Sequence, residues 1–232
     1  MKTLLSVFFL TALVSCTSPG SEPGEQPHKS SHKSGDEESQ ADKGNLYLWS
    51  FQFSGVRGKE YAWYYLSDDG VLVKNPKHGV DPLSIELEKE DNADNTATYK
   101  IKGDEIEVHW DNGQKTTWGL EYKGDVITGM DSGPMSQPKA FDDGFTLHAK
   151  YYAALVLQDA KAGKYLALKD DGSAVLSNED GTDASQGKYN IKGHTLTITI
   201  DGNVQKAIIG YLAEEGKKSV IINDHFMDTV LD

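Results

Sequence analysis

The fold is decided by the stretch Tyr99-Lys100-Ile101-Lys102-Gly103-Asp104-Glu105-Ile106-Glu107-Val108, because the chain repeats it as Tyr189-Asn190-Ile191-Lys192-Gly193-His194-Thr195-Leu196-Thr197-Ile198. An earlier block also recurs, since residues 65–73 and residues 167–175 share an Asp-Asp-Gly turn in the same order. A duplicated unit defines the architecture before any strand is assigned. We therefore divide the body of the chain into repeat 1, residues 46–140, and repeat 2, residues 141–232.

Apolar residues alternate with polar ones inside the repeated stretch. Ile106 and Val108 alternate with charged residues in repeat 1, and Leu196, Ile198 and Ile200 alternate with threonines in repeat 2. A period of two indicates strands with one buried face, and the Asp-Gly and Asn-Gly pairs between them suit two-residue hairpins. We expect an all-β chain with two tandem antiparallel small barrels or sandwiches. The alternative is one larger barrel or sandwich formed by both repeats.

The spacing of glycine and apolar residues in repeat 2 carries a family resemblance. The pattern Gly187-x-Tyr189-x-Ile191-x-Gly193-x-x-Leu196 resembles lipocalin-like repeats of exported bacterial proteins, and repeat 1 departs from it because Ala97 replaces the first glycine. The matched positions are turn glycines and core residues. The resemblance therefore implies the fold and transfers no functional residue, because function has to be argued from a site.

The first fifteen residues are a predicted secretory signal peptide, with an apolar run of about eleven residues where a spanning helix needs about twenty. The run ends in Leu13-Val14-Ser15-Cys16, which holds the only cysteine of the chain and resembles the lipobox of bacterial lipoprotein precursors. The resemblance implies cleavage before Cys16, lipidation of that residue and a lipid-anchored protein of the bacterial cell envelope. In a Gram-negative source it implies the outer membrane. The alternative is an ordinary signal peptide that ends in a cysteine by chance.

Residues 16–45 form a predicted disordered linker, which contains three of the seven prolines and no aromatic residue. Such a segment cannot bury enough apolar surface to offset the entropy of ordering it. His28 and His32 are four residues apart, a spacing that binds a metal only on a helix, and the composition does not favour a helix. We therefore predict no metal site in the linker.

The charge and the cysteine count exclude several classes of protein. With 23 Lys and Arg against 36 Asp and Glu, the formal net charge is −13, which is unsuited to a nucleic acid partner. A single cysteine excludes an intramolecular disulfide and a thiolate metal cluster. No cofactor is predicted.

Repeat 1 carries an insertion at residues 75–95. The distance from the Asp-Asp-Gly turn to the repeated tyrosine is 29 positions in repeat 1 and 17 in repeat 2. Asp81-Pro82 suits the start of a helix over residues 83–89, although residues 83–87 also alternate as a strand would. The insertion is either the recognition element or a solvated cap. If it carries recognition, replacing residues 76–94 by a Gly/Ser connector should abolish partner binding at little cost in stability.

The insertion is also acidic. Its carboxylates can supply oxygen ligands for Ca²⁺, but they match no recognisable calcium loop, so we predict no metal site there. They are Glu86, Glu88, Glu90, Asp91 and Asp94.

All four tryptophans lie in repeat 1. Trp110 and Trp118 are in register with apolar residues, which indicates core positions. The strand around Trp63 is apolar on both faces, so it is either central between two layers or borders a cavity. Trp63 and Tyr64 are the predicted ligand contacts.

The chain shows no catalytic motif, phosphate loop or dinucleotide fingerprint, so no catalytic residue is predicted and an enzyme has no positive support. Our hypothesis is a lipid-anchored, non-enzymatic binding or interaction module of a bacterial envelope, whose partner is a small apolar ligand or an envelope protein. One alternative is an envelope hydrolase that uses carboxylates of the insertion. The other is a structural subunit of an envelope complex.

Overall fold

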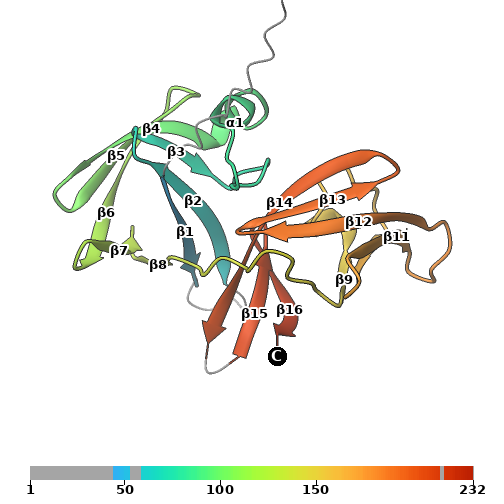
Figure 1. Ribbon diagram of the computed structural model, residues 1–232. Coiled ribbons are helices and arrows are strands. Elements are labelled where there is room, and N and C mark those ends of the chain that lie inside the picture. The colour runs from blue at the N-terminus through green and yellow to red at the C-terminus, as the bar shows by residue number, and fades with distance from the viewer. Residues whose placement is uncertain (1–43, 53–58, 215–216, 232) are drawn as a thin grey trace, which may run out of the picture. The chain divides into compact units, whose positions relative to one another are not determined.

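The computed structural model describes residues 44–52, 59–214 and 217–231, whose strands form two eight-stranded antiparallel sheets in tandem (Figure 1). The predicted signal peptide, Cys16 and the linker up to residue 43 lie outside the described residues. In the part described, no helix is long and apolar enough to cross a membrane. The prediction of an all-β chain with two tandem barrels is confirmed. The alternative of one fused barrel is wrong, because each repeat builds its own sheet.

The first sheet closes into a barrel. Its strands are β1 (Gly44–Phe51), β2 (Glu60–Ser67), β3 (Val71–Lys74), β4 (Thr96–Lys102), β5 (Glu105–Trp110), β6 (Lys115–Lys123), β7 (Val126–Met130) and β8 (Gly133–Ser136). They pair in chain order, and β1 also pairs with β8 where Trp49 lies opposite Met135. That last pairing joins the two ends of the sheet.

The second sheet is nearly closed. Its strands are β9 (Ala149–Tyr152), β10 (Lys164–Leu168), β11 (Ser173–Asn178), β12 (Ser185–Lys192), β13 (Thr195–Ile200), β14 (Asn203–Glu214), β15 (Lys217–Ile222) and β16 (His225–Leu231), with a 3-10 turn η2 (Ala153–Leu155) after β9. They too pair in chain order, which leaves β9 and β16 at the two ends. Each repeat thus folds as a meander of short hairpins.

The repeated tyrosine makes the same contacts in both sheets. The hydroxyl of Tyr99 donates to Ser67 O at 2.7 Å, and the hydroxyl of Tyr189 donates to Lys169 O at 2.9 Å. The backbone N–H of each tyrosine also donates to the glycine carbonyl of the Asp-Asp-Gly turn, at 2.8 and 2.9 Å. Each tyrosine therefore fastens that turn to the strand that follows it, which explains why turn and tyrosine recur together.

The residues on the predicted apolar face fill each barrel. Ile106 and Val108 are fully buried in the cluster inside the first barrel, and Leu196 and Ile198 are buried in the cluster inside the second. Burying one apolar side chain of this size contributes about 1.5–3 kcal/mol relative to leaving it exposed. The period of two in the sequence is thus the pattern that separates core from solvent.

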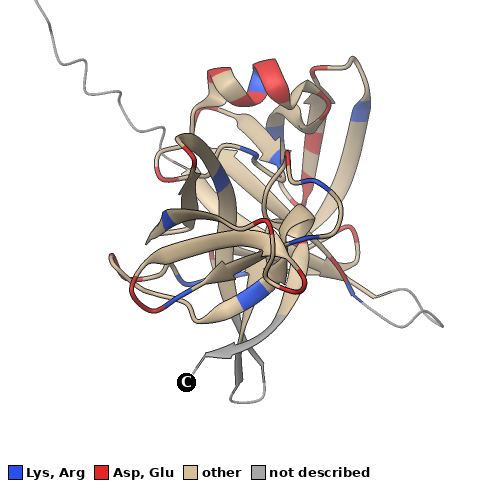
Figure 2. Cartoon of the chain, turned by 90° about the vertical axis from the view of Figure 1, so that its right-hand side faces the viewer, with Lys and Arg blue, Asp and Glu red and all other residues tan. Residues whose placement is uncertain are grey.

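The insertion of repeat 1 contains the α-helix α1 (Ile85–Asp91) and the 3-10 turn η1 (Ala93–Asn95). The helix begins two residues later than predicted, because Ser84 rather than Asp81 caps it. The Ser84 hydroxyl accepts the backbone N–H of Leu87 at 3.4 Å. Four acidic residues of the insertion, Glu86, Glu88, Glu90 and Asp91, belong to this helix, and Figure 2 shows acidic positions along it in red.

Candidate functional site

Trp63, the first predicted ligand contact, packs between the two sheets. Its side chain is fully buried in a cluster with Leu48 of β1, Ile208 of β14 and Ile221 of β15. Its indole N–H donates to the backbone carbonyl of Asn223. Both sheets belong to one compact unit, Gln40–Asp232. The structure therefore places Trp63 in a packed contact that joins repeat 1 to repeat 2.

Tyr64, the second predicted contact, points to the opposite face of β2 and is buried inside the first barrel. Its ring meets Trp118 edge to face with 5.9 Å between centroids, and Trp118 meets Trp110 in the same way. Burial raises the pKa of the Tyr64 hydroxyl to about 12, with a smaller contribution from Asp131. Strand β2 is therefore central between two packed layers. Neither Trp63 nor Tyr64 lines the two pockets described below.

One carboxylate of the insertion braces it from inside. Glu88 is fully buried, and its Oε1 accepts the backbone N–H groups of Lys77 and His78, both at 2.7 Å. Its Oε2 accepts the side-chain N–H of Asn92 at 3.0 Å. Three donors thus satisfy a carboxylate that would be costly to bury alone. Among the residues that the structure describes, no group of three His, Cys, Asp or Glu side chains is arranged to hold a metal ion.

A second carboxylate fastens the insertion to repeat 2. Asp81 Oδ2 accepts the backbone N–H of His194 at 2.6 Å, in the turn between β12 and β13. The hydroxyl of the buried Thr195 accepts the backbone N–H groups of Val80 and Asp81 at 2.8 and 2.9 Å. The side chain of Gln158 also donates to Lys77 O at 2.9 Å. The insertion is therefore an integral contact between the repeats, which neither of the two sequence interpretations included.

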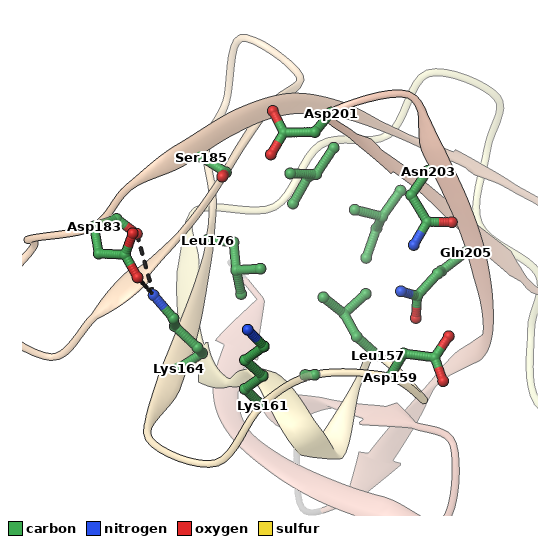
Figure 3. A pocket seen from close by; sticks show the side chains of 13 residues that line it. Leu157, Asp159, Lys161, Lys164, Leu176, Asp183, Ser185, Asp201, Asn203 and Gln205 are labelled. Carbon is green, nitrogen blue, oxygen red and sulfur yellow. Dashed lines mark hydrogen bonds and ion pairs between the residues drawn. The ribbon is translucent and has the colours of Figure 1, made fainter.

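The second barrel holds a pocket of about 390 Å³ at one end of its interior (Figure 3). Its apolar residues are Leu157, Ala160, Leu176, Ile198 and Ile200. The polar residues around them are Asp159, Lys161, Lys164, Asp183, Ser185, Asp201, Asn203 and Gln205. A volume of this size lies within the range of about 300–1,000 Å³ that small-molecule sites occupy, and such sites combine an apolar lining with a few polar groups.

The two lysines of the pocket differ in their partners. Lys164 Nζ pairs with the Asp183 carboxylate and donates to the Asp183 carbonyl at 3.2 Å. The hydrogen bond from Lys164 and then its positive charge lower the pKa of Asp183, against an opposing effect of desolvation, and the charge of Lys161 adds the smallest contribution. Lys161 is exposed, and its side-chain ammonium makes no hydrogen bond or ion pair with a described residue. It is therefore the available cation of the pocket.

This electrostatic arrangement suits binding more than acid catalysis. A carboxyl group that acts as a general acid at neutral pH needs a raised pKa, whereas the pKa of Asp183 is lowered. The pocket combines apolar residues with one cation, Lys161, and with two further carboxylates, Asp159 and Asp201, so its five charged side chains sum to −1. A molecule with an apolar body can place one anionic group at Lys161 only if that group lies away from the two carboxylates.

No local motif in the sequence marks this pocket, because its lining comes from five strands, β10 to β14, from two of the loops between them and from the segment after η2. One signal was present in the sequence. Gln205 is in register with Ala207 and Ile209, which face the barrel interior. A polar side chain at the end of an inward-facing register indicates the mouth of a barrel rather than its packed core.

Comparison with protein-family models, with curated proteins and with solved structures found nothing that matches this chain.

Proposed function

We propose that this protein is a lipid-anchored, non-enzymatic binding module of a bacterial envelope, and that repeat 2 carries its small-molecule site. The observation that supports the proposal is the pocket of about 390 Å³ at the end of the second barrel, with an apolar floor and an unpaired Lys161 at its rim. The proposed ligand is a small amphipathic molecule with one carboxylate or similar anionic group. All residues that line the pocket belong to repeat 2, and repeat 1 packs against repeat 2 through Trp63 and Asp81.

The apolar floor provides most of the proposed affinity. Leu157, Leu176, Ile198 and Ile200 border the same space, and each Å² of apolar surface removed from water contributes about 25 cal/mol. Lys161 adds orientation, because a partly exposed ion pair contributes about 0.2–1 kcal/mol. A linear carboxylate with a chain of medium length satisfies both parts of the pocket.

Calorimetric titration with decanoate and with decanol tests this assignment. We expect decanoate to bind at one site per chain and Lys161→Gln to weaken it by about twofold to fivefold, the equivalent of 0.4–1 kcal/mol, while decanol binding stays the same. Lys188→Gln is the matched control, because Lys188 is an exposed lysine of β12 that does not line the pocket. Equal losses in both variants, or no saturable binding of decanoate, would exclude the proposed ligand class.

The anchor is the second part of the proposal, and it rests on the lipobox resemblance of Leu13-Val14-Ser15-Cys16. Two or more acyl chains on Cys16 hold a protein stably at a membrane, whereas one chain gives only reversible binding. Expression of wild type and Cys16→Ala in a bacterium, followed by detergent phase partitioning, tests it. Wild type should enter the detergent phase and the variant should not. Detergent-phase recovery of the variant would remove the anchor from the proposal.

A further inference from the structure

We propose that the first half of β14 is a docking edge, residues 203–206, that binds an extended peptide segment of a partner protein by strand addition. β14 has two halves with different neighbours. Asn203 to Ile208 pair with β13, and Ile209 to Glu214 pair with β15. The second half of β14 also has a neighbour on the side that faces β13, because Lys139 forms an isolated bridge with Tyr211 there. The opposite side of the first half has no neighbouring strand among the described residues.

The hydrogen-bond register of β14 shows which of its backbone groups have no strand to bond to. Ile209 N–H donates to His194 O at 2.8 Å, so odd-numbered residues of β14 bond toward β13. Asn223 N–H donates to Ile208 O at 2.9 Å, so even-numbered residues bond toward the side of β15. β15 ends at Ile222, opposite Ile209. The backbone N–H and C=O groups of Val204 and Lys206 therefore point past the end of β15, where no described residue bonds to them.

The docking edge borders a groove of about 330 Å³. The other residues of the groove are Lys77, His78, Leu87 and Asp91 of the insertion of repeat 1, and Gln158 and Asp159 from the segment after η2. Exposed apolar side chains stand on both walls, because Leu87 is 45% exposed and Val204 is 57% exposed. Open backbone groups beside exposed apolar side chains are the features that a bound strand uses, the first for affinity and the second for specificity.

The second wall and the charges of the groove indicate its occupant. A second copy of this chain would have to bring a whole folded sheet past the insertion to reach the edge, whereas a single extended segment needs only the groove. The formal charges of the groove cancel, since Lys77 and Lys206 are balanced by Asp91 and Asp159. We therefore assign the docking edge to an uncharged extended segment whose apolar side chains contact Leu87 and Val204. Asp159, Asn203 and Gln205 border both the pocket and the groove, but the inference does not depend on the pocket ligand, because the open backbone groups belong to Val204 and Lys206.

Amide hydrogen exchange of the full chain, measured by NMR, tests the docking edge. The probe is the peptide acetyl-Thr-Val-Thr-Val-Thr-amide. At saturation it should slow exchange of the Val204 and Lys206 amides at least tenfold. The amides of Gln205 and Ala207 face β13, so their exchange should be unchanged. Unchanged exchange at Val204 and Lys206 would overturn the proposal.

Two variants separate strand addition from other binding. Lys206→Pro removes an N–H that faces the groove and leaves the bonds to β13 in place, so it should raise the Kd of the peptide at least tenfold. Lys206→Ala keeps the N–H and should change the Kd less than twofold. If Lys206→Pro does not fold, the peptide provides the same comparison. A peptide that is N-methylated at its two valines and a peptide that is N-methylated at its central threonine should differ at least tenfold in Kd, because only alternate amides of a bound strand face the edge.

The remaining outcomes identify other occupants. Slow exchange of Val204 and Lys206 without peptide, lost on deletion of residues 17–43, would show that the linker of the same chain fills the edge. A doubled mass in solution that disappears in Lys206→Pro would show a second copy there. Either result would overturn the assignment to a partner peptide.

Discussion

Asp81 of the insertion accepts the backbone N–H of His194 at 2.6 Å, across 113 positions of sequence. The turn that presents this N–H is shaped for the contact, because a Cβ on Gly193 would lie 2.7 Å from the Asp81 carboxyl carbon and the φ angle of Gly193 is +59°. A carboxylate of repeat 1 and a glycine turn of repeat 2 thus fit each other directly. The insertion therefore holds the two repeats together and also lines the groove beside β14.

Replacing Asp81 by alanine should destabilise the protein by about 1–3 kcal/mol, because it leaves the His194 N–H without its acceptor. Urea denaturation measures the change as a lower midpoint. Glu90→Ala is the control, since Glu90 is an exposed carboxylate of the same insertion, and it should stay within about 0.5 kcal/mol of wild type. Equal midpoints for Asp81→Ala and Glu90→Ala would mean that the contact adds nothing to stability.

Replacing residues 76–94 by a Gly/Ser connector should strongly destabilise the protein, contrary to the expectation from loop length alone. That expectation counted only closure entropy, about 0.6 kcal/mol per doubling of length. The structure adds the contacts of Asp81 and of the buried Glu88. The single substitution Glu88→Ala removes only the contacts of Glu88. It should lower the free energy of unfolding by about 1–3 kcal/mol for each donor that it leaves unsatisfied. Thermal unfolding should show a clear loss for Glu88→Ala and none for Glu86→Ala, which changes an exposed residue.

His194 should make the stability depend on pH. Burial lowers the pKa of its side chain, against opposing effects of the Ile209 carbonyl and the Asp81 charge. The unfolded chain therefore takes up a proton near pH 6.5 that the folded chain does not. The contribution is fully present above about pH 6.5 and decreases as the pH falls toward the folded pKa, with a slope no steeper than about 1.36 kcal/mol per pH unit.

Urea denaturation at pH 7.5 and pH 5.5 measures this effect. His194→Asn should lose less stability between the two pH values than wild type loses, because its side chain does not titrate. His109→Gln changes an exposed histidine of the first barrel and should keep the wild-type dependence. An unchanged dependence in His194→Asn would assign the effect to other groups.

Ile198 links the core of repeat 2 to its pocket, because it belongs to the buried cluster and also lines the pocket. Ile198→Ala should destabilise the protein by about 2–5 kcal/mol and also weaken decanoate binding in the molecules that remain folded. Leu166→Ala removes a fully buried residue of the same cluster that does not line the pocket. It should lower stability by a similar amount and leave binding intact.

The sequence predicted the fold because the repeated turns and the period of two are local patterns. Ile106 and Ile198 are buried where that period places them. The apolar faces of the strand around Trp63 left two arrangements open, and only the pairing with repeat 2 distinguishes a central strand from one that borders a cavity.

The candidate sites could not be predicted from the sequence, because their residues come together only in the folded chain. Asp81 contacts the backbone of His194, and Lys161 and Ile198 line the same pocket, only after the chain has folded. Residues far apart in sequence that belong to no shared motif give no local signal. The polar Gln205 in an inward-facing register was the exception, since it indicated one end of the barrel.

Methyl NMR of the isoleucine and leucine side chains during titration with decanoate shows directly whether the binding site lies in repeat 2. We expect saturable shifts confined to Leu157, Leu176, Ile198 and Ile200, the leucines and isoleucines that line the pocket of the second barrel. The methyl groups of Ile106 and Leu72, which are buried inside the first barrel, should not move. Shifts centred on the first barrel, or none that saturate, would contradict the assignment of the binding site to repeat 2.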